Sequence, residues 1–335
     1  AVFFRFLPQM LRGNIPLKKF VIFLKRLAFF LSKMKHNKFA NIEGNTRIDL
    51  YCPGFPSKAF YTACNKFAEF EGKLPCTTVL ISVTSACKFN CRHCYQKYDL
   101  GIAFFNIEGG EPFMVYDRLL KVCSSIDDRS EIWINSTGFG MTLDKLKELK
   151  RNNVTAVMFS LHSPEPTELN AFMGNEGAWD IMSEGVAMCH EAGIAVAFNC
   201  CLLKQDFYNG NFEKVMDRTR EFGASIVQII KPKPSGGWLE SGIEEFKEED
   251  RLRVINLVNK YNLNSKYKEY PSISAQIMEE DKEQFGCTAG GTDRFYINAK
   301  GDLQPCEFLN ISFGNIGTED FDEIYGKMRS CFLIP

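Results

Sequence analysis

The chain of 335 residues has almost no net charge, and it has no internal repeat and no low-complexity segment. Because 40 basic residues stand against 41 acidic ones, the chain as a whole lacks the positive field that attracts nucleic acid, and we expect no nucleic-acid partner. Its 45% apolar residues exclude a disordered or collagen-like chain and are enough for one large domain with an appendage.

Cysteine, in contrast, is abundant, with 13 residues at irregular spacings. A chain of this length and apolar content does not need disulfide bonds to fold, so the pattern indicates a reducing compartment and a cytoplasmic protein in which some cysteines bind a metal or a cluster. Others are expected to be small buried apolar residues, namely Cys52, Cys64, Cys76, Cys123 and Cys189.

Residues 1–42 contain no acidic residue, no apolar run longer than five residues and no cleavage site of small residues after an apolar core. The segment is therefore unlike a membrane-spanning helix, which needs about 20 apolar residues, and unlike a signal peptide. It holds nine Lys and Arg and eight Phe, whereas the 31 basic and 41 acidic residues after Ile42 leave a charge of −10.

After Pro16, the basic and aromatic residues of this segment recur at helical spacing on opposite faces. Such a helix is typical of a protein that lies on a membrane surface. The same pattern arises when the apolar face packs on the protein's own body and the lysines point outward, and the pattern alone does not decide between the two.

From Thr77 onward, short apolar strands alternate with helical patterns, which is the signature of an α/β fold with a parallel sheet. Six strands are predicted, which is fewer than a closed eight-stranded barrel needs. We predict a partial (β/α)6 TIM-like barrel over residues 77–265, preceded by an amphipathic helical region (1–76) and followed by a small β-hairpin, cluster-binding extension (266–335). The expected strands are 78–84, 103–107, 131–135, 156–161, 194–203 and 225–230, and the expected helices are 116–125, 143–152, 178–192, 211–222 and 244–261.

Only residues 95–101 separate Cys94 from the second predicted strand. A crossover between parallel strands takes a dozen or more residues. We therefore expect either a stretch omitted between Gly101 and Ile102 or a departure from the regular barrel, and we favour omission.

Cys87, Cys91 and Cys94 directly follow the first strand, at the end of the sheet where α/β barrels build their active sites. Three thiolates fit a cubane cluster whose fourth iron stays open to a ligand. A zinc ion would need a fourth ligand, and the adjacent His93 and Cys94 cannot easily point at one tetrahedral ion. The spacing therefore favours an iron–sulfur cluster over zinc.

On these cysteines the chain resembles the radical S-adenosylmethionine (SAM) enzymes, and the resemblance extends over roughly residues 77–235. Gly109, Gly110, Glu111 and Pro112 end the second strand and are similar to the family's GGEP motif. The resemblance implies that the backbone of this motif and the Glu111 carboxylate receive the amino group of SAM. Further residues that end strands would contact SAM or merely cap the strand, namely Asn135, Ser136, Ser160 and Asn199. Two residues after Ser160, where the family often has Asp, this chain has His162.

The resemblance also implies the cofactors, the partner and the reaction. The cofactors would be a [4Fe-4S] cluster and SAM, and the partner a reductant protein such as flavodoxin or ferredoxin. SAM would be cleaved reductively to methionine and a 5′-deoxyadenosyl radical, which takes a hydrogen atom from an unactivated C–H bond.

Cys287 and Cys306 flank a predicted hairpin whose turn contains Gly301. The spacing resembles the start of a SPASM/Twitch extension, which implies an auxiliary iron–sulfur cluster. A cubane normally takes four thiolates, and Cys331 is the cysteine that remains downstream. We expect these three cysteines to be ligands.

Cys200 and Cys201 are consecutive in a predicted strand, so their side chains face opposite sides of the sheet and one of them must face the barrel interior. A thiol in that position could donate a hydrogen atom during catalysis, although plain packing also explains both residues.

Three functions remain open at this stage. The Phe-rich basic segment favours a lipid or other apolar substrate and a peripheral position on the inner face of the membrane. A peptide- or protein-modifying enzyme is the alternative, although residues 1–76 lack the run of three short strands and helices expected of a leader-peptide recognition domain. The third is an electron-transfer or sensor protein without turnover, which would release no deoxyadenosine.

Overall fold

The computed structural model describes residues 2–68, 78–82, 102–233, 235, 244–280, 286–292 and 294–332. Its main feature is a nine-stranded sheet with the order β11-β10-β3-β4-β5-β6-β7-β8-β9. All neighbours from β10 to β9 are parallel, and only β11 is antiparallel, to β10. The strands are β3 (Thr78–Ser82), β4 (Phe104–Glu108), β5 (Glu131–Ser136), β6 (Val154–Ser160), β7 (Ala195–Cys201), β8 (Ile226–Ile230), β9 (Ser272–Ala275), β10 (Arg294–Ile297) and β11 (Leu303–Gln304).

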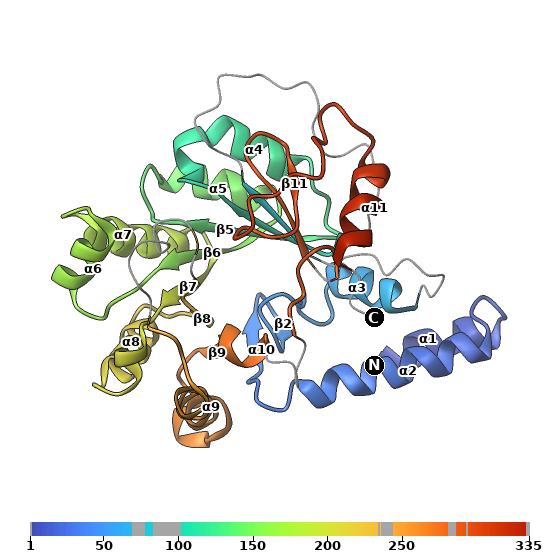
Figure 1. Cartoon of the computed structure of the whole chain (residues 1–335), viewed down its shortest axis with the longest axis horizontal. Coiled ribbons are helices and arrows are strands. Elements are labelled where there is room, and N and C mark those ends of the chain that lie inside the picture. Colours follow the sequence, from blue (N-terminus) through green and yellow to red (C-terminus); the bar gives the residue numbers. More distant parts are fainter. Residues whose placement is uncertain are drawn as a thin grey trace.

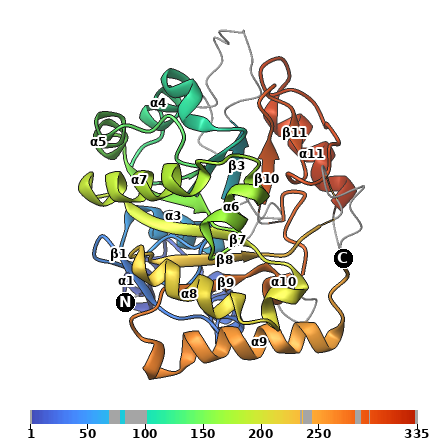
Figure 2. The same ribbon diagram turned by 90° about the vertical axis from the view of Figure 1, so that its left-hand side faces the viewer.

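Helices cover the outside of this curved sheet (Figures 1 and 2). They are α4 (Tyr116–Ser124), α5 (Leu143–Arg151), α6 (Pro166–Met173), α7 (Ala178–Glu191), α8 (Asn211–Glu221), α9 (Glu248–Leu263) and the short α10 (Gln276–Glu279), with 3₁₀ turns at Pro112–Val115, Lys204–Phe207 and Ser265–Tyr267. The remaining elements are α1 (Val2–Leu11), α2 (Leu17–Lys33), β1 (Ala40–Ile42), β2 (Asn45–Arg47), α3 (Lys58–Ala68) and α11 (Phe321–Phe332). The predicted α/β class with a mostly parallel sheet, as in a partial TIM-like barrel, is confirmed.

Local chemistry sets where these helices begin and end. Thr142 caps α5 by accepting a hydrogen bond from the Lys145 amide at 3.3 Å, and Lys150 and Arg151 lie in its last turn, where positive charge is favourable. Helix α6 begins with Pro166 and ends at Gly174, which has a φ of 62°.

The two faces of the sheet pack against different parts of the chain. Outward residues such as Ile107, Phe159 and Phe198 pack under the helices. Inward residues, among them Phe104 and Trp133, form a second apolar cluster with Leu50 and Tyr51. The segment that contains β1 and β2 therefore closes the amino-terminal end of the barrel, and it leaves the carboxyl ends of the strands for the site.

The sequence did not predict how two of the strands pair in the sheet. β9 is a seventh barrel strand that pairs with β8, so the sheet continues beyond residue 265. β10 belongs to the predicted C-terminal hairpin but also pairs with β3, which makes the extension part of the same sheet. The predicted division of the chain into three regions stays a prediction.

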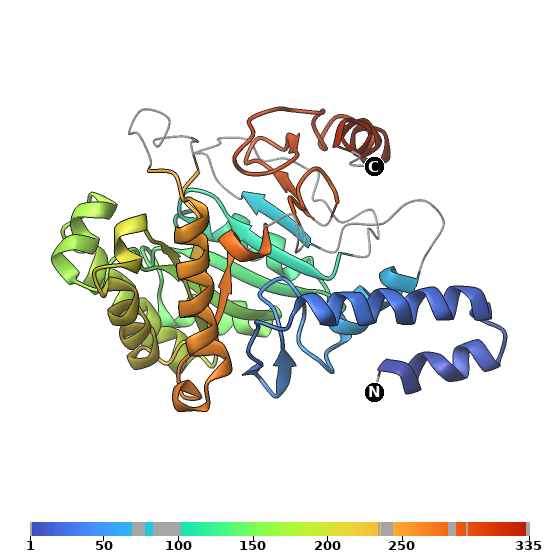
Figure 3. The same ribbon diagram turned by 60° about the horizontal axis from the view of Figure 1, so that its bottom comes forward.

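The N-terminal helices form a hairpin that extends away from the barrel (Figure 3). Helix α2 begins after Pro16, as predicted, but Phe20 and Phe23 pack against Phe6 of α1 and Cys64 of α3. The apolar face of α2 therefore packs on the protein itself, which is the second of the two alternatives. Among the described residues, no helix is long and apolar enough to cross a membrane.

The cysteine cluster at residues 87–94 and the Gly101–Ile102 junction lie outside the described residues. β3 and β4, on either side, are parallel neighbours in the sheet. The omission between Gly101 and Ile102 stays a prediction.

Candidate active site

A cavity of about 560 Å³ opens at the carboxyl ends of the parallel strands. Its lining includes the predicted cofactor residues Gly109, Gly110, Asn135, Ser160 and Asn199. These come from β4, β5, β6 and β7, and the turn after β10 forms another wall, with Asn298 and Lys300. The structure therefore brings together residues that are widely separated in the sequence.

Glu111 is held by its own chain rather than left open. Its carboxylate accepts hydrogen bonds from the Phe113 amide (3.2 Å), the Ser136 hydroxyl (2.7 Å), and the amide (2.8 Å) and hydroxyl (2.5 Å) of Thr137. A carboxylate has about four acceptor positions, and all are used here. Glu111 and Ser136 thus fix the loop after β4 against the end of β5, and the next residue in the loop, Pro112, is buried. Direct contact of either residue with SAM stays a prediction.

Asn135 and Asn199 have the opposite property, because no described residue donates to one oxygen of each. Within the part of the chain that the structure describes, Oδ1 of both residues is buried and accepts no hydrogen bond. The Asn199 side chain is also only 9% exposed and lines the cavity. A buried amide oxygen without a donor is costly, so each is suited to a ligand that brings N–H or O–H groups. SAM, with its amino group, ribose hydroxyls and adenine amine, fits this requirement.

Replacing Asn199 with alanine is expected to weaken SAM binding about tenfold, the effect of losing one hydrogen bond to a buried group. Stability should change little, because Oδ1 makes no internal hydrogen bond within the described residues. Equilibrium dialysis of SAM against the reconstituted protein measures the effect. Gln205→Ala, at an exposed amide in the loop after β7, is the control. Equal SAM affinities for wild type and Asn199→Ala would remove Asn199 from the site.

His162 lines the cavity in a defined protonation state. Its Nδ1 lies 3.1 Å from the Cys201 amide, which donates to it, and its ring packs 4.7 Å from the ring of Phe172. Burial lowers the pKa of His162 to about 4, so the ring is neutral at pH 7. Since Nδ1 is the acceptor, the proton must be on Nε2. His162 thus presents a donor where the family often has an acidic acceptor.

Glu108 is a site residue that the sequence analysis missed. It ends β4 and lines the cavity, and its Oε2 accepts hydrogen bonds from Asn135 (3.0 Å) and Asn106 (3.2 Å). Burial, followed by the nearby Glu307 carboxylate, raises the pKa of Glu108 to about 8. The signal was its place immediately before Gly-Gly, at a strand end that faces the cavity.

This raised pKa predicts a pH dependence of stability in the chain without cofactors. Between its usual pKa and about 8, Glu108 keeps its proton in the folded state and loses it in the unfolded state. Stability therefore falls as the pH rises through this range, by up to about 1.4 kcal/mol per pH unit. Relative to wild type, Glu108→Gln should gain about 4 kcal/mol at pH 8 and less than about 1 kcal/mol near pH 5. Urea unfolding at both pH values measures this gain, and an equal gain at both would contradict it.

The two consecutive cysteines face opposite sides, as the strand geometry requires. Cys200 is fully buried in the cluster under the helices. Cys201 pairs in register with Ile230, which lines the cavity, and it is partly exposed. Burial raises the pKa of the Cys201 thiol to about 11, so it is protonated at neutral pH. Cys201 is therefore the thiol on the inner side, and its catalytic role stays a prediction.

The C-terminal cysteines come from segments that meet at Gly290. Its amide donates to the Pro305 carbonyl at 2.9 Å, and a Cβ on Gly290 would lie 2.5 Å from that of Phe332. Cys306 is buried, whereas Cys287 and Cys331 are exposed. Among the described residues, no three His, Cys, Asp or Glu side chains are close enough to hold a metal ion. The ligands of the auxiliary cluster therefore stay a prediction. The assignment of Cys87, Cys91 and Cys94 as ligands of the SAM-binding cluster stays a prediction as well.

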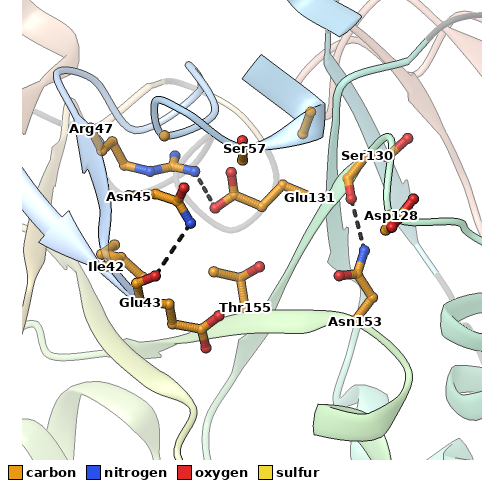
Figure 4. Close-up of a pocket in the computed structure, with 12 residues that line it drawn as sticks. Ile42, Glu43, Asn45, Arg47, Ser57, Asp128, Ser130, Glu131, Asn153 and Thr155 are labelled. Atoms are coloured by element: carbon orange, nitrogen blue, oxygen red, sulfur yellow. Dashed lines mark hydrogen bonds and ion pairs between the residues drawn. The ribbon is translucent and has the colours of Figure 1, made fainter. Parts of the chain in front are cut away.

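A smaller hollow of about 100 Å³ lies at the other end of the barrel, between the β1–β2 segment and the start of β5 (Figure 4). Its main feature is the ion pair between Arg47 and Glu131. Arg47 also donates to the carbonyls of Leu50 and Asp49 and lies 4.7 Å from the ring of Trp133. These contacts attach the N-terminal segment to the barrel floor, away from the strand ends where the chemistry is expected.

Comparison with known proteins identifies the class. The Radical SAM superfamily model matches residues 97–217, beginning just after Cys94, and the model of the iron–sulfur cluster-binding domain SPASM matches residues 287–332. The chain is therefore a radical SAM protein with a C-terminal SPASM domain. These two domains imply a [4Fe-4S] cluster, SAM and an auxiliary iron–sulfur cluster as cofactors.

The individual relatives are distant in sequence. The chain is similar to the AdoMet-dependent heme synthase of Nitratidesulfovibrio vulgaris, with 21% identity over 297 residues that cover 77% of this chain and 80% of that protein. It is also similar to the GTP 3′,8-cyclase of Campylobacter fetus subsp. fetus, with 22% identity over 259 residues that cover 68% of this chain and 78% of that protein.

Solved structures share the fold. The crystal structure of Streptococcus suis SuiB matches with a TM-score of 0.60 at 17% identity, over 82% of this chain and 71% of that one. The structure of anSMEcpe with bound AdoMet and the Cp18Cys peptide matches with a TM-score of 0.55 at 15% identity, over 77% of this chain and 82% of that one.

Proposed function

We propose that this chain is a radical SAM enzyme that abstracts a hydrogen atom from an unactivated C–H bond of a substrate held in the cavity at the strand ends. The observation that carries the proposal is the convergence of Gly109, Gly110, Asn135, Ser160 and Asn199 on one cavity beside the SPASM domain. When bound and reduced by one electron, SAM supplies the 5′-deoxyadenosyl radical.

The chain's own residues position the cofactor and the substrate. The carboxylate of Glu111 fixes the turn that the GGEP-like motif forms, and Asn135 and Asn199 offer SAM oxygens that no described residue hydrogen-bonds. The Nε2–H group of His162, which follows β6, offers a hydrogen-bond donor to the ligand. Held in this way, the reacting atoms stay close together and water is displaced from the cavity.

The lining of the cavity favours a polar, peptide-like substrate. Its described walls carry amide, hydroxyl, imidazole, carboxyl and ammonium groups, and the aliphatic residues among them are Ile230 and Ala299. A long apolar chain would leave these polar groups without partners. SuiB has been crystallised with its precursor peptide SuiA, and anSMEcpe with a peptide, so the fold accommodates such ligands in those proteins. We therefore place the peptide-modifying function ahead of the lipid-modifying one.

The exposed surface of the N-terminal hairpin supports the lipid alternative. Apolar residues remain exposed on the N-terminal hairpin, including Phe4 (73% exposed), Leu11 (72%) and Leu17 (63%), beside the exposed Lys18 and Lys25. The proposal includes contact of this hairpin with an anionic membrane surface, since its basic charge is complementary to anionic lipid and the rest of the chain is acidic.

Replacing Phe4 and Leu11 together with serine is expected to reduce binding to anionic vesicles about tenfold, because both side chains would be buried at the bilayer surface. Co-sedimentation with vesicles of phosphatidylglycerol and phosphatidylcholine measures it, with pure phosphatidylcholine vesicles as the control. Wild-type protein that does not sediment with anionic vesicles would exclude the membrane contact.

Deuterium transfer tests the proposed function and separates the substrate classes. The anaerobically reconstituted enzyme, SAM and a reductant protein are incubated with deuterated peptide extracts or with deuterated lipid extracts. Deuterium in 5′-deoxyadenosine from the peptide fraction supports the leading proposal. Deuterium from the lipid fraction alone favours the alternative, and no 5′-deoxyadenosine at all favours an electron-transfer or sensor role.

A further inference from the structure

The wall of the cavity at the strand ends has an inner and an outer level. Ser160 of β6 pairs in register with Asn199 of β7, and both residues line the inner level. His162 lies two residues beyond Ser160, where its Nδ1 accepts the hydrogen bond from the Cys201 amide. Cys201 in turn pairs in register with Ile230 of β8. Because these strands are parallel, His162 and Ile230 lie farther toward the carboxyl ends and line the outer level.

The turn after β10 brings Lys300 to the same cavity. Hydrogen bonds hold the backbone of this turn in place. The Lys300 amide donates to Oδ1 of Asn298 at 2.9 Å, and the Lys300 carbonyl accepts from the Asn315 side chain at 2.8 Å. The Lys300 side chain itself is exposed. A fixed turn therefore presents an ammonium group to the cavity.

Hydrogen-bond donors prevail at the outer level and in this turn. His162 presents Nε2–H, because its Nδ1 already acts as the acceptor. The ammonium group of Lys300 has donors only. Asn310 also lines the cavity, and its Oδ1 already accepts a hydrogen bond from a glutamine side chain at 2.8 Å, so its NH₂ group is the part that can serve a ligand. The unsatisfied oxygens of Asn135 and Asn199, in contrast, are acceptors.

The charge of the wall favours the same kind of ligand. At neutral pH His162 is uncharged, and Glu108 is mostly protonated because burial raises its pKa to about 8. Of the carboxyl, imidazole and ammonium groups in the described wall, only that of Lys300 is then charged. A carboxylate accepts hydrogen bonds at about four positions and carries one negative charge, so it matches both the donors and the charge.

We propose that His162 and Lys300 form a subsite for a carboxylate of the substrate, so that the enzyme prefers peptides with an Asp or Glu side chain. His162 donates a hydrogen bond through Nε2, and Lys300 supplies the opposite charge. The acceptors of the inner level are left to SAM, so the cofactor and the substrate use different levels of the wall. This inference rests on the proposed function and deepens it, because it names the side chain that the cavity recognises.

The test uses two small probes of nearly equal shape that differ in charge, N-acetyl-glutamate amide and N-acetyl-glutamine amide. Isothermal titration calorimetry measures their binding to the anaerobically reconstituted, SAM-loaded protein for wild type, His162→Phe, His162→Gln and Lys300→Met. Lys266→Met, at an exposed lysine in the 3₁₀ turn after α9, is the matched control for the loss of one positive charge. Each variant is also titrated with SAM alone, and its iron content is measured.

Wild type should bind the glutamate probe at least about tenfold more tightly than the glutamine probe, the effect of one charge-assisted hydrogen bond. His162→Phe and Lys300→Met should each lose most of this preference, and Lys266→Met should keep it. His162→Gln retains a side-chain N–H donor, so it should keep more of the preference than His162→Phe. All variants should bind SAM as wild type does.

Wild type that does not favour the glutamate probe overturns the proposal. So does full preference in either His162→Phe or Lys300→Met. Weaker SAM binding with an unchanged probe preference also overturns it, because the donors would then serve the cofactor. Since the Lys300 side chain is exposed, its replacement tests the subsite even if His162→Phe fails to fold. Formation of 5′-deoxyadenosine by the same preparations tests the proposed function separately.

Discussion

Cys91→Ala is expected to abolish 5′-deoxyadenosine formation, with a rate at least about a thousandfold below wild type. The resemblance to radical SAM enzymes assigns Cys91 as one of three thiolate ligands in the loop after the first barrel strand. Removing one ligand leaves too few thiolates to hold the cluster, and without it SAM receives no electron. Chromatography of 5′-deoxyadenosine after anaerobic reduction measures the loss, and iron analysis should show a parallel loss of bound iron.

Cys123→Ala is the matched control for this change. Cys123 is fully buried in α4 and packs in the outer core, so its replacement should cost about 1 kcal/mol of stability and leave turnover intact. Unchanged iron content and turnover in Cys91→Ala would contradict the assignment of the cluster site.

The second large effect concerns stability. Arg47→Ala should lower the free energy of unfolding by about 3–5 kcal/mol, because it leaves Glu131 buried without its cation. The Arg47 side chain is 1% exposed and pairs with Glu131, which also accepts a hydrogen bond from the Trp133 indole at 2.8 Å. Urea unfolding of the purified protein measures the change.

A double substitution separates charge from packing at this position. Arg47→Met combined with Glu131→Gln removes both charges and keeps most of the volume, so it should recover most of the lost stability. Arg129→Ala, which removes an exposed guanidinium paired with Asp127, should change stability by less than about 1 kcal/mol. A single Arg47→Ala variant as stable as the Arg129 variant would show that the buried pair contributes little.

Much of the barrel could be predicted because its strands are short apolar runs separated by helical patterns. β9 was missed because it has only four residues, two of them serine, and nothing in the sequence shows that it lies beside β8. For α2 the amphipathic pattern correctly predicted a helix. It could not show that Phe20 and Phe23 would pack on α1 and α3.

Site residues could be predicted where a sequence motif marks the end of a strand. They could not be predicted where the surroundings of a side chain depend on residues that are distant in the sequence. Gly109, Gly110 and Asn199 carry such signals, and the structure brings them to one cavity. Glu108 carries a weaker signal, because its raised pKa depends on its burial and on a carboxyl almost two hundred residues away, and its hydrogen bonds come from Asn106 and Asn135. Most of the donors to Glu111 were equally invisible, since Ser136 and Thr137 lie at the end of the next strand.

The most direct test of the account is the fate of SAM in the reduced, fully reconstituted protein. Anaerobic incubation with a reductant protein should yield methionine and 5′-deoxyadenosine in equal amounts, and Asn199→Ala should need a higher concentration of SAM to reach the same rate. A protein that contains its full iron and sulfide and binds SAM, yet releases no 5′-deoxyadenosine under these conditions, would contradict the account.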